Sequence, residues 1–401
     1  MSAPIRGVGG AAELASKAAL VFCSLVFGLT ALEAALRVLG CTPDESRRMQ
    51  SEPSSPSVYI QYPHETPGYG YRPGHVFSKV YFRCRGSDCR EDQRIEFRIN
   101  SAGLRDREHP LEKGPDTVRV LVLGDSMAVG DGVALEQSFP KRLEALLNGR
   151  FRGCPRFEVI NAAVEGYNSF DEWSYLKRRG LRYQPDIIVV GLYLNDTLPA
   201  LTPDEPSPAD AAGFYSAQRE LNANFAASNI IPSRQYRSRL YLARWLSAFR
   251  ETRQAAGKTR RWYRLLWSGG NPGMERFETA WDGFSRIQKE RGLPVLVVTF
   301  PVLVWLESGY PFDDIHERIR SLCGQRGLRD LDLLPYLRGR RSTSLWHHPS
   351  DRHPSAWVHD LAASLALERL CREPALRERI YRAARRREAC VAARRTSGSG
   401  S

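Results

Sequence analysis

The segment VRVLVLGDS, residues 118–126, decides the fold class of this chain. Its first seven residues form an apolar run of strand length that ends at a glycine, and FPKRLEALLN at 139–148 follows with a helical pattern. A buried strand of a parallel sheet and its crossover helix have this appearance, because helices cover both faces of such a sheet. The sequence therefore predicts a parallel α/β unit from Val118 onward.

The same unit repeats along the chain. Further apolar runs of strand length are FEVINAA at 157–163, DIIVVGLYL at 186–194, LPVLVVTFP at 293–301 and LRDLDLL at 328–334. Helical patterns accompany them at 172–179, 276–291, 315–325 and 355–370. Alternating strands and helices are typical of a doubly wound sheet. We predict a three-layer α/β/α fold with a mainly parallel, five-stranded sheet.

The alternation stops between Asp196 and Arg276. Within this interval, RQYRSRLYLARWLSAFR at 234–250 is helical in pattern, basic and aromatic. We expect an insertion at about 197–275 that forms a helical cap over the carboxyl ends of the strands, where open α/β sheets bind their ligands. An amphipathic surface that faces a membrane is the alternative.

An uncharged apolar run, AALVFCSLVFGLTAL at 18–32, precedes the rest of the chain. With its apolar flanks it is just long enough to cross a bilayer, which takes roughly 20 mainly apolar residues. We predict an uncleaved transmembrane helix within residues 1–40, with its short N-terminal side inside the cell and the body outside. A cleaved signal peptide, including a lipoprotein signal ending at Gly40-Cys41, and a buried helix are the alternatives.

Composition suggests the other boundaries. Residues 41–115 combine a Ser/Pro-rich segment with alternating segments such as VYFRCR at 80–85, and they predict a linker and a small β-rich extension. The α/β domain is expected at 116–371, and a basic helical tail at 372–401.

The formal net charge is +13, and the chain has eight cysteines. Much of the basic excess falls in 234–264 and 372–395, and no nucleic-acid recognition motif is present, so we expect no nucleic-acid partner. The cysteines are too few for a disulfide scaffold. Cys84 and Cys89 can close a small loop in an oxidising compartment, but they lack the second pair that a zinc site needs.

Polar motifs lie where the predicted strands end. Gly124-Asp125-Ser126 places a serine on a strand-to-helix turn, beside the free N–H groups of a helix N-terminus. The triplet alone is a weak signal, because serine is also a favoured helix N-cap. NAAVEGYN at 161–168 follows the second strand, YLND at 193–196 ends the third, and PSDRHP at 349–354 precedes the last helix. We expect these motifs to meet at one edge of the sheet.

Ser, Gly, Asn and Asp-x-His in this order resemble the SGNH, or GDSL-type, hydrolase family. The resemblance covers about residues 100–370, includes NSAGLR at 100–105 and FPVL at 300–303, and is greatest for the membrane-anchored bacterial members. It implies ester hydrolysis or acyl transfer, often on glycans, with no cofactor and no metal.

The resemblance also implies a role for each matching residue. Ser126 would be the nucleophile, His353 the general base, and Asp351 the group that orients the imidazole. The oxyanion hole would consist of the Ser126 N–H, the Gly166 N–H and the Asn195 side-chain amide. Asp125 and Asp196 are expected to tie loops to the backbone rather than to take part in catalysis.

Two features depart from the family pattern, and three other histidines lie nearby. Tyr193 fills a position that is commonly glycine, which indicates an altered pocket wall. The pair Asp351-x-His353 is one residue shorter than the common Asp-x-x-His. His347 and His348 lack a carboxylate at similar spacing and are interpreted as loop residues. His359 falls within the last helix and is interpreted as structural.

The sequence thus favours an extracytoplasmic serine esterase or O-acyltransferase, held at the bacterial inner membrane by a single span. Its expected substrates are acyl esters of carbohydrate, acetyl esters first, or other small esters. Two other classes stay open: a lipase or phospholipase at the membrane surface, and a non-catalytic glycan-binding or assembly protein on the same fold. The sequence gives no indication of the oligomeric state.

Overall fold

The computed structural model describes residues 8–39, 47–51, 58–62, 67–85, 88–114, 116–151, 156–199, 240–349 and 351–372, together with Pro374 and Glu378. Most of the predicted basic tail at 372–401 lies outside these residues, as does 200–239 of the predicted cap.

A five-stranded parallel sheet forms the centre of the molecule, which confirms the predicted fold class. Its strand order is β10-β9-β8-β6-β7. The strands are β6 (Thr117–Gly124), β7 (Arg156–Asn161), β8 (Ile187–Tyr193), β9 (Val295–Phe300) and β10 (Arg329–Asp332). The chain leaves β6 towards β7 and leaves β8 in the opposite direction, towards β9. The topological switch point, where such sheets bind ligands, therefore lies at the carboxyl ends of β6 and β8.

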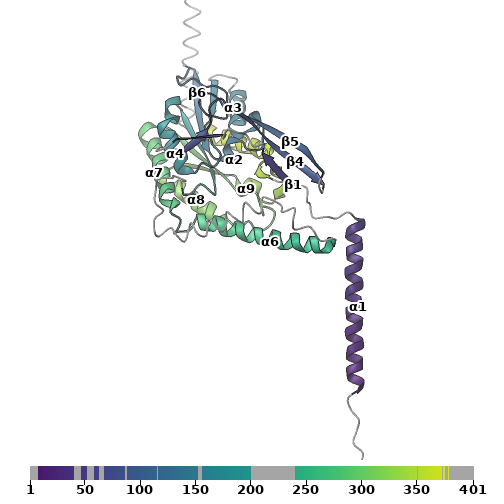
Figure 1. Ribbon diagram of the computed structural model, residues 1–401. Coiled ribbons are helices and arrows are strands. Elements are labelled where there is room, and N and C mark those ends of the chain that lie inside the picture. The colour runs from purple at the N-terminus through teal and green to yellow at the C-terminus, as the bar shows by residue number, and fades with distance from the viewer. Residues whose placement is uncertain are drawn as a thin grey trace, which may run out of the picture.

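Helices cover the sheet in two layers (Figure 1). In one layer α3 (Phe139–Arg150) packs against α10 (Ala356–Cys371). In the other, α7 (Gly273–Arg291) packs against α4 (Ser169–Arg178) and α8 (Asp313–Arg326). Short helical elements lie in the connections: α2 (Ser126–Val129), α9 (Leu334–Leu337) and the 3-10 turns at Leu135–Gln137, Gly180–Tyr183 and Ser342–Ser344.

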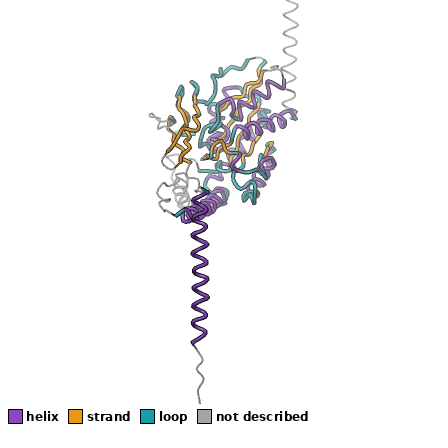
Figure 2. The backbone as a smooth tube through the Cα atoms, turned by 90° about the vertical axis from the view of Figure 1, so that its right-hand side faces the viewer, coloured by secondary structure: helices purple, strands orange, loops and turns teal. Residues whose placement is uncertain are grey.

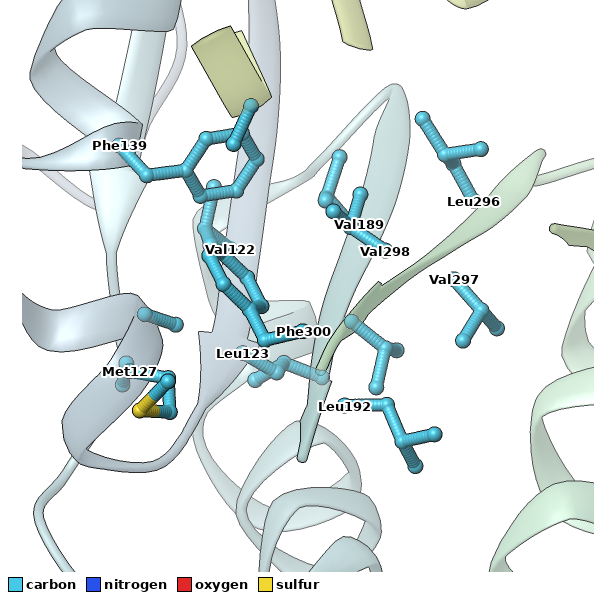
Figure 3. Packing of buried hydrophobic residues seen from close by; sticks show 14 of the residues in the cluster. Val122, Leu123, Met127, Phe139, Val189, Leu192, Leu296, Val297, Val298 and Phe300 are labelled. Carbon is cyan, nitrogen blue, oxygen red and sulfur yellow. The ribbon is translucent and has the colours of Figure 1, made fainter. Parts of the chain in front are cut away.

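The core lies between the sheet and these helices. Val122 of β6 and Phe300 of β9 are fully buried, and the Phe300 ring meets the Phe139 ring of α3 edge to face, with centroids 6.0 Å apart (Figure 3). β6, β8 and β9 are buried along almost their whole length, as the continuous apolar runs predict.

Residues 41–115 carry small antiparallel sheets. One has the order β1-β4-β5, with β1 (Arg47–Ser51), β4 (Val76–Arg85) and β5 (Asp88–Arg98). The other pairs β2 (Tyr59–Gln61) with β3 (Tyr69–Tyr71). Figure 2 shows the β4–β5 hairpin on one side of the α/β body. Its backbone register places Cys84 opposite Cys89.

Two long helices lie outside the three layers. Within α1 (Val8–Val38), the segment Glu13–Val38 is apolar and long enough to cross a membrane, with a mean hydropathy of 2.1 in its most apolar part. α6 (Tyr241–Leu266) follows the undescribed part of the predicted cap and runs beneath the body in Figure 1.

A second hairpin was not predicted. Short strands β11 (Trp346–His348) and β12 (Asp351–Pro354) pair antiparallel just before α10.

Candidate active site

Ser126 lies on a tight turn between β6 and α2. Asp125 caps the helix, because its carboxylate accepts the Met127 N–H at 2.8 Å. Gly124 has a φ of +151°, and a Cβ there would lie 2.5 Å from the Ala128 Cβ, so the turn requires glycine at this position. Ala128 and its two helical neighbours are buried, whereas Ser126 is half-buried. The turn thus leaves Ser126 as the residue of this helix that is open to a ligand.

The β11–β12 hairpin presents the His353–Asp351 pair. His353 Nδ1 lies 2.6 Å from Asp351 Oδ1, and the His353 backbone N–H donates to the same oxygen at 3.1 Å. On its other oxygen, Asp351 accepts the Tyr81 hydroxyl at 3.2 Å. Burial alone would raise the pKa of Asp351, but the adjoining His353 and His347 outweigh it and hold that pKa well below its usual range. The shortened Asp-x-His spacing is therefore compatible with a close carboxylate–imidazole pair.

The hairpin packs against α2, which brings His353 to the Ser126 turn. The link runs through Asp131, whose backbone N–H donates to the Ser126 carbonyl at 3.2 Å and whose Oδ2 lies 3.8 Å from His353 Nε2. Within the described residues no hydrogen bond joins Ser126 Oγ to His353. Such a bond often tightens only when substrate is bound.

His353 therefore lies between two carboxylates. Burial lowers its pKa, but the charges of Asp351 and Asp131 more than compensate and raise the pKa of His353 to about 10. Burial likewise acts to raise the pKa of Asp131, yet His353 and Lys79 outweigh it and the pKa of Asp131 is lowered. At neutral pH this arrangement favours an imidazolium flanked by two carboxylates.

A polar network from the β-rich segment reaches this pair. Lys79 of β4 lies 2.6 Å from Asp131 and 3.0 Å from Glu165, and the Tyr59 hydroxyl donates to Glu165 at 2.9 Å. The sequence analysis did not identify Lys79, Tyr81 or Asp131 as site residues. The GDG at 130–132 is the sequence signal for Asp131, because it directly follows the serine turn.

The two other predicted oxyanion residues lie on neighbouring loops of the same sheet edge. Gly166 lies in the loop after β7. Its φ is +82°, and a Cβ at this position would lie 2.8 Å from the Tyr69 hydroxyl oxygen, so the backbone conformation and the space both require glycine. Asn195 follows β8. Its side chain is close enough to the Asp125 carboxyl to act to lower the pKa of Asp125. Burial outweighs that effect and raises the pKa of Asp125 to about 6.

Tyr193 connects the sheet edge to α6. Its hydroxyl lies 2.8 Å from the Tyr263 hydroxyl of α6, and the indole N–H of Trp267 donates to the Leu194 carbonyl at 2.8 Å. Asp196 accepts the Tyr193 N–H at 3.3 Å, a bond to the backbone of its own loop as predicted, and it also accepts the Ser169 hydroxyl at the start of α4 at 3.1 Å.

The interpretation of His347 and His348 as loop residues is wrong, because both belong to strand β11 and each has a carboxylate nearby. His347 Nε2 lies 3.1 Å from Asp351 Oδ2, and His348 Nε2 lies 3.1 Å from Asp92. Both rings pack against the Tyr81 ring of β4, with centroids 4.6 Å and 5.1 Å away, a contact that spacing alone does not show. His359 is buried in α10, and its Nδ1 accepts the Phe139 N–H at 3.2 Å, in keeping with a structural role. Among the described residues, no cluster of His, Cys, Asp and Glu could hold a metal ion.

Comparison with known proteins gives the family. The model of the GDSL-like lipase/acylhydrolase family matches residues 122–361, more than half of the chain. No curated protein matches.

Solved structures resemble the chain only distantly. A two-domain esterase active on acetylated mannans is 15% identical over 65% of this chain, with a TM-score of 0.37, and the match spans 50% of that esterase. A lipase/acylhydrolase from Enterococcus faecalis is 14% identical over 63% of this chain and 95% of its own, with a TM-score of 0.35. An acetylxylan esterase from Geobacillus stearothermophilus is 13% identical over 63% and 93%, with a TM-score of 0.37. The assignment therefore rests on the family model, and the chain belongs to the GDSL-like lipase/acylhydrolase family of SGNH-type ester hydrolases.

Proposed function

We propose that this protein is a serine esterase or O-acyltransferase that uses Ser126 as its nucleophile and acts on short acyl esters, acetyl in the first place, of carbohydrate. One observation carries the proposal: a half-buried serine begins a helix at the switch point of the sheet, and the helix packs against the hairpin that holds the 2.6 Å His353–Asp351 pair. Ser126, His353 and Asp351, the proposed nucleophile, base and orienting carboxylate, thus lie close to one another at this edge of the sheet.

In the proposed reaction, Ser126 Oγ attacks the ester carbonyl carbon and passes its proton to His353 Nε2. Asp351 stabilises the imidazolium through Nδ1–H. The carbonyl oxygen becomes an oxyanion that accepts hydrogen bonds from the N–H groups of Ser126 and Gly166 and from the Asn195 amide. The C–O bond to the leaving alcohol breaks as His353 returns the proton to it, leaving an acyl-Ser126 ester. Water or a sugar hydroxyl then takes the acyl group by the reverse sequence, so hydrolase and transferase share every residue.

The side chains around the pair support a polar substrate. Lys79, Glu165 and the Tyr59 hydroxyl form a polar network on the Asp131 side of His353. The Tyr81 hydroxyl donates to Asp351 on the other side. Hydroxyl, ammonium and carboxylate groups can form hydrogen bonds with sugar hydroxyls, whereas a long acyl chain gains nothing from them. A lipase or phospholipase is the second candidate, and the apolar α1 favours it.

The proposal includes the cellular location and the domain division. We propose that α1 anchors residues 1–40 in the inner membrane, with the rest of the chain outside the cytoplasm; a signal sequence is the alternative. The segments 41–115, 116–371 and 372–401 would be the linker with its β-rich extension, the hydrolase domain with its insertion, and the tail.

Ester hydrolysis by the full-length protein in detergent tests the proposal. Ser126→Ala should abolish release of p-nitrophenol from p-nitrophenyl acetate. Ser355→Ala is a matched control, because Ser355 lies two residues after His353 and its buried hydroxyl has no hydrogen-bond partner among the described residues. The rate should fall from acetyl to octanoyl esters, and acetylated oligosaccharides should release acetate. Folded wild type that cleaves only long-chain esters would favour the lipase, and Ser126→Ala with wild-type rates would refute the nucleophile.

A further inference from the structure

The two ends of α6 have different surroundings. At its C-terminal end, Trp262 and Leu266 are buried in the body, and Tyr263 contacts Tyr193 beside the proposed oxyanion loop. Towards its N-terminal end, Leu246 is 57% exposed, and the preceding residue Leu240 is 54% exposed. α6 therefore extends from the wall of the active site to the outside of the body.

The N-terminal end of α6 meets α1. The residue at its N-cap, Leu240, provides no side-chain cap. Instead, the Glu33 carboxylate of α1 accepts the backbone N–H groups of Tyr241 at 2.9 Å and Leu242 at 2.8 Å. Arg37 donates to Glu33 at 2.7 Å and lies over the Tyr241 ring, 5.6 Å from its centroid. A carboxylate at a helix N-terminus satisfies free N–H groups and complements the helix dipole, so this contact fixes α6 to the apolar helix.

The position of Glu33 along α1 sets the level of α6. The charge-free segment Ala18–Leu32 spans about 22 Å at 1.5 Å per residue, less than the roughly 30 Å of a hydrocarbon core. Lys17 precedes this segment, and at the same rise Glu33 lies about 24 Å and Arg37 about 30 Å further along α1. With Lys17 at one boundary of the hydrocarbon core, Glu33 and Arg37 would lie close to the opposite boundary if α1 crosses the membrane. The start of α6 is at the same level.

α6 also has the direction of a helix that lies on a membrane. It runs across the axis of α1 in Figure 1 and is seen nearly end-on at the top of α1 in Figure 2. α6 lies beneath the α/β body in Figure 1, and α1 extends from the level of α6 in the direction away from the body. A bilayer crossed by α1 would therefore lie along the length of α6.

The charge of α6 suits an anionic surface. It contains one acidic residue, Glu251, and seven basic residues: Arg244, Arg250, Arg253, Lys258, Arg260, Arg261 and Arg264. Arg264 pairs with Asp314, and Arg260 lies over the Trp305 ring, but Arg250 and Arg261 are exposed. A basic helix with exposed leucines is typical of interfacial binding, where each lysine or arginine near an anionic surface contributes about 1 kcal/mol.

We infer that α6 lies in the headgroup layer of the membrane and binds anionic phospholipid. The inference rests on the proposed anchoring by α1. It also has a consequence for the proposed esterase: Tyr263 and Trp267 hold the loop after β8, so α6 would keep the catalytic edge of the sheet at a fixed height above the lipid. In Figure 1 α2 lies between β6 and α6, so this edge faces the membrane side.

Site-specific photo-cross-linking of the full-length protein in lipid nanodiscs tests the inference. A benzophenone side chain would replace Leu246 of α6, Phe27 of α1 as the anchor control, or Leu111 near the start of β6 as the far-side control; all three are exposed. We expect lipid adducts at Phe27 and Leu246 and none at Leu111. Adducts at Leu246 should increase severalfold when phosphatidylglycerol is added to phosphatidylcholine.

The outcomes separate the inference from the proposals on which it rests. Adducts at Phe27 alone would leave the anchor intact and overturn the interfacial helix. Adducts at neither position would overturn both. A cross-link from Leu246 to a second protein chain would assign this surface to self-association and overturn the inference. None of these outcomes depends on esterase activity.

Charge reversal provides a second measurement. Arg250→Glu with Arg261→Glu should reduce the Leu246 adduct to its level in phosphatidylcholine alone, while hydrolysis of soluble p-nitrophenyl acetate stays unchanged. Arg150→Glu with Arg291→Glu is the matched control, because both arginines are exposed at helix ends on the opposite edge of the sheet. An adduct that is insensitive to the α6 reversal would show that anionic headgroups are not the ligand.

Discussion

Asp131→Asn should make the enzyme more active at neutral pH. The substitution keeps the shape of a buried side chain and removes a negative charge 3.8 Å from His353 Nε2. As a general base, His353 must be neutral before it accepts the Ser126 proton, yet two carboxylates raise its pKa to about 10. Removing one of them disfavours the imidazolium, so the pKa of His353 falls and more of the enzyme is in the competent form.

The distance gives the magnitude. Two unit charges about 4 Å apart interact by about 4 kcal/mol at an effective dielectric constant of about 20. At 1.36 kcal/mol per pKa unit, the upper limit is a decrease of about 3 units. Lys79, which lies 2.6 Å from Asp131, already offsets part of this charge, so we expect a decrease of about 1–2 units. Because each unit changes the neutral fraction of His353 tenfold, kcat/KM at pH 7 should rise about 10- to 100-fold.

The assay is the pH profile of kcat/KM for p-nitrophenyl acetate, corrected for hydrolysis without enzyme. The acid limb of this profile reports the base in the free enzyme. It should move to lower pH in Asp131→Asn and to higher pH in Lys79→Met, since the Lys79 charge lowers the pKa of His353. An Asp131→Asn profile with an unmoved acid limb would refute the reasoning, whatever its absolute rate.

Three further substitutions test other parts of the account. Asn195→Ala should lower kcat by about 100- to 1,000-fold with little effect on KM, because it removes one oxyanion donor; an unchanged kcat would exclude that role. Gly124→Ala should lower kcat/KM by about 100-fold through displacement of Ser126, whereas Gly149→Ala, which meets open space, should not. Glu172 is fully buried, and among the residues that the structure describes its carboxyl has no hydrogen-bond partner. Burial raises the pKa of Glu172 well above its ordinary value of 4.5. The folded state therefore retains a proton that the unfolded state has lost, and the free energy of unfolding falls as pH rises above 4.5. In chemical denaturation, Glu172→Gln should stabilise the protein by about 1–3 kcal/mol at pH 8 and by much less at pH 4. Equal gains at both pH values would contradict this.

The sheet could be predicted because its strands are continuous apolar runs. DIIVVGLYL and LPVLVVTFP have the length and the continuous apolar character of a strand covered on both faces, and such strands joined by helices are typical of a doubly wound sheet. The positions of Ser126, Gly166 and Asn195 follow from the same logic, since each lies in the loop or turn that follows the carboxyl end of a strand.

The surroundings of His353 could not be predicted. Tyr81 and Lys79 are single polar residues in alternating strands, and Tyr81 contacts Asp351 across 270 positions of sequence. Such contacts depend on how a small β-sheet docks on the α/β body, and no periodicity encodes that docking. The capping of α6 by Glu33 could not be predicted either, because it joins residues more than 200 positions apart. In the sequence, Glu33 only interrupts an apolar run.

The central claim is that Ser126 is the nucleophile, and covalent labelling tests it most directly. The full-length protein would be treated with a fluorophosphonate, digested and mapped by mass spectrometry. We predict a single phosphonylated residue, Ser126, with labelling slowed by p-nitrophenyl acetate and lost in His353→Ala. Folded protein that stays unlabelled, or is labelled at another serine, would contradict the account.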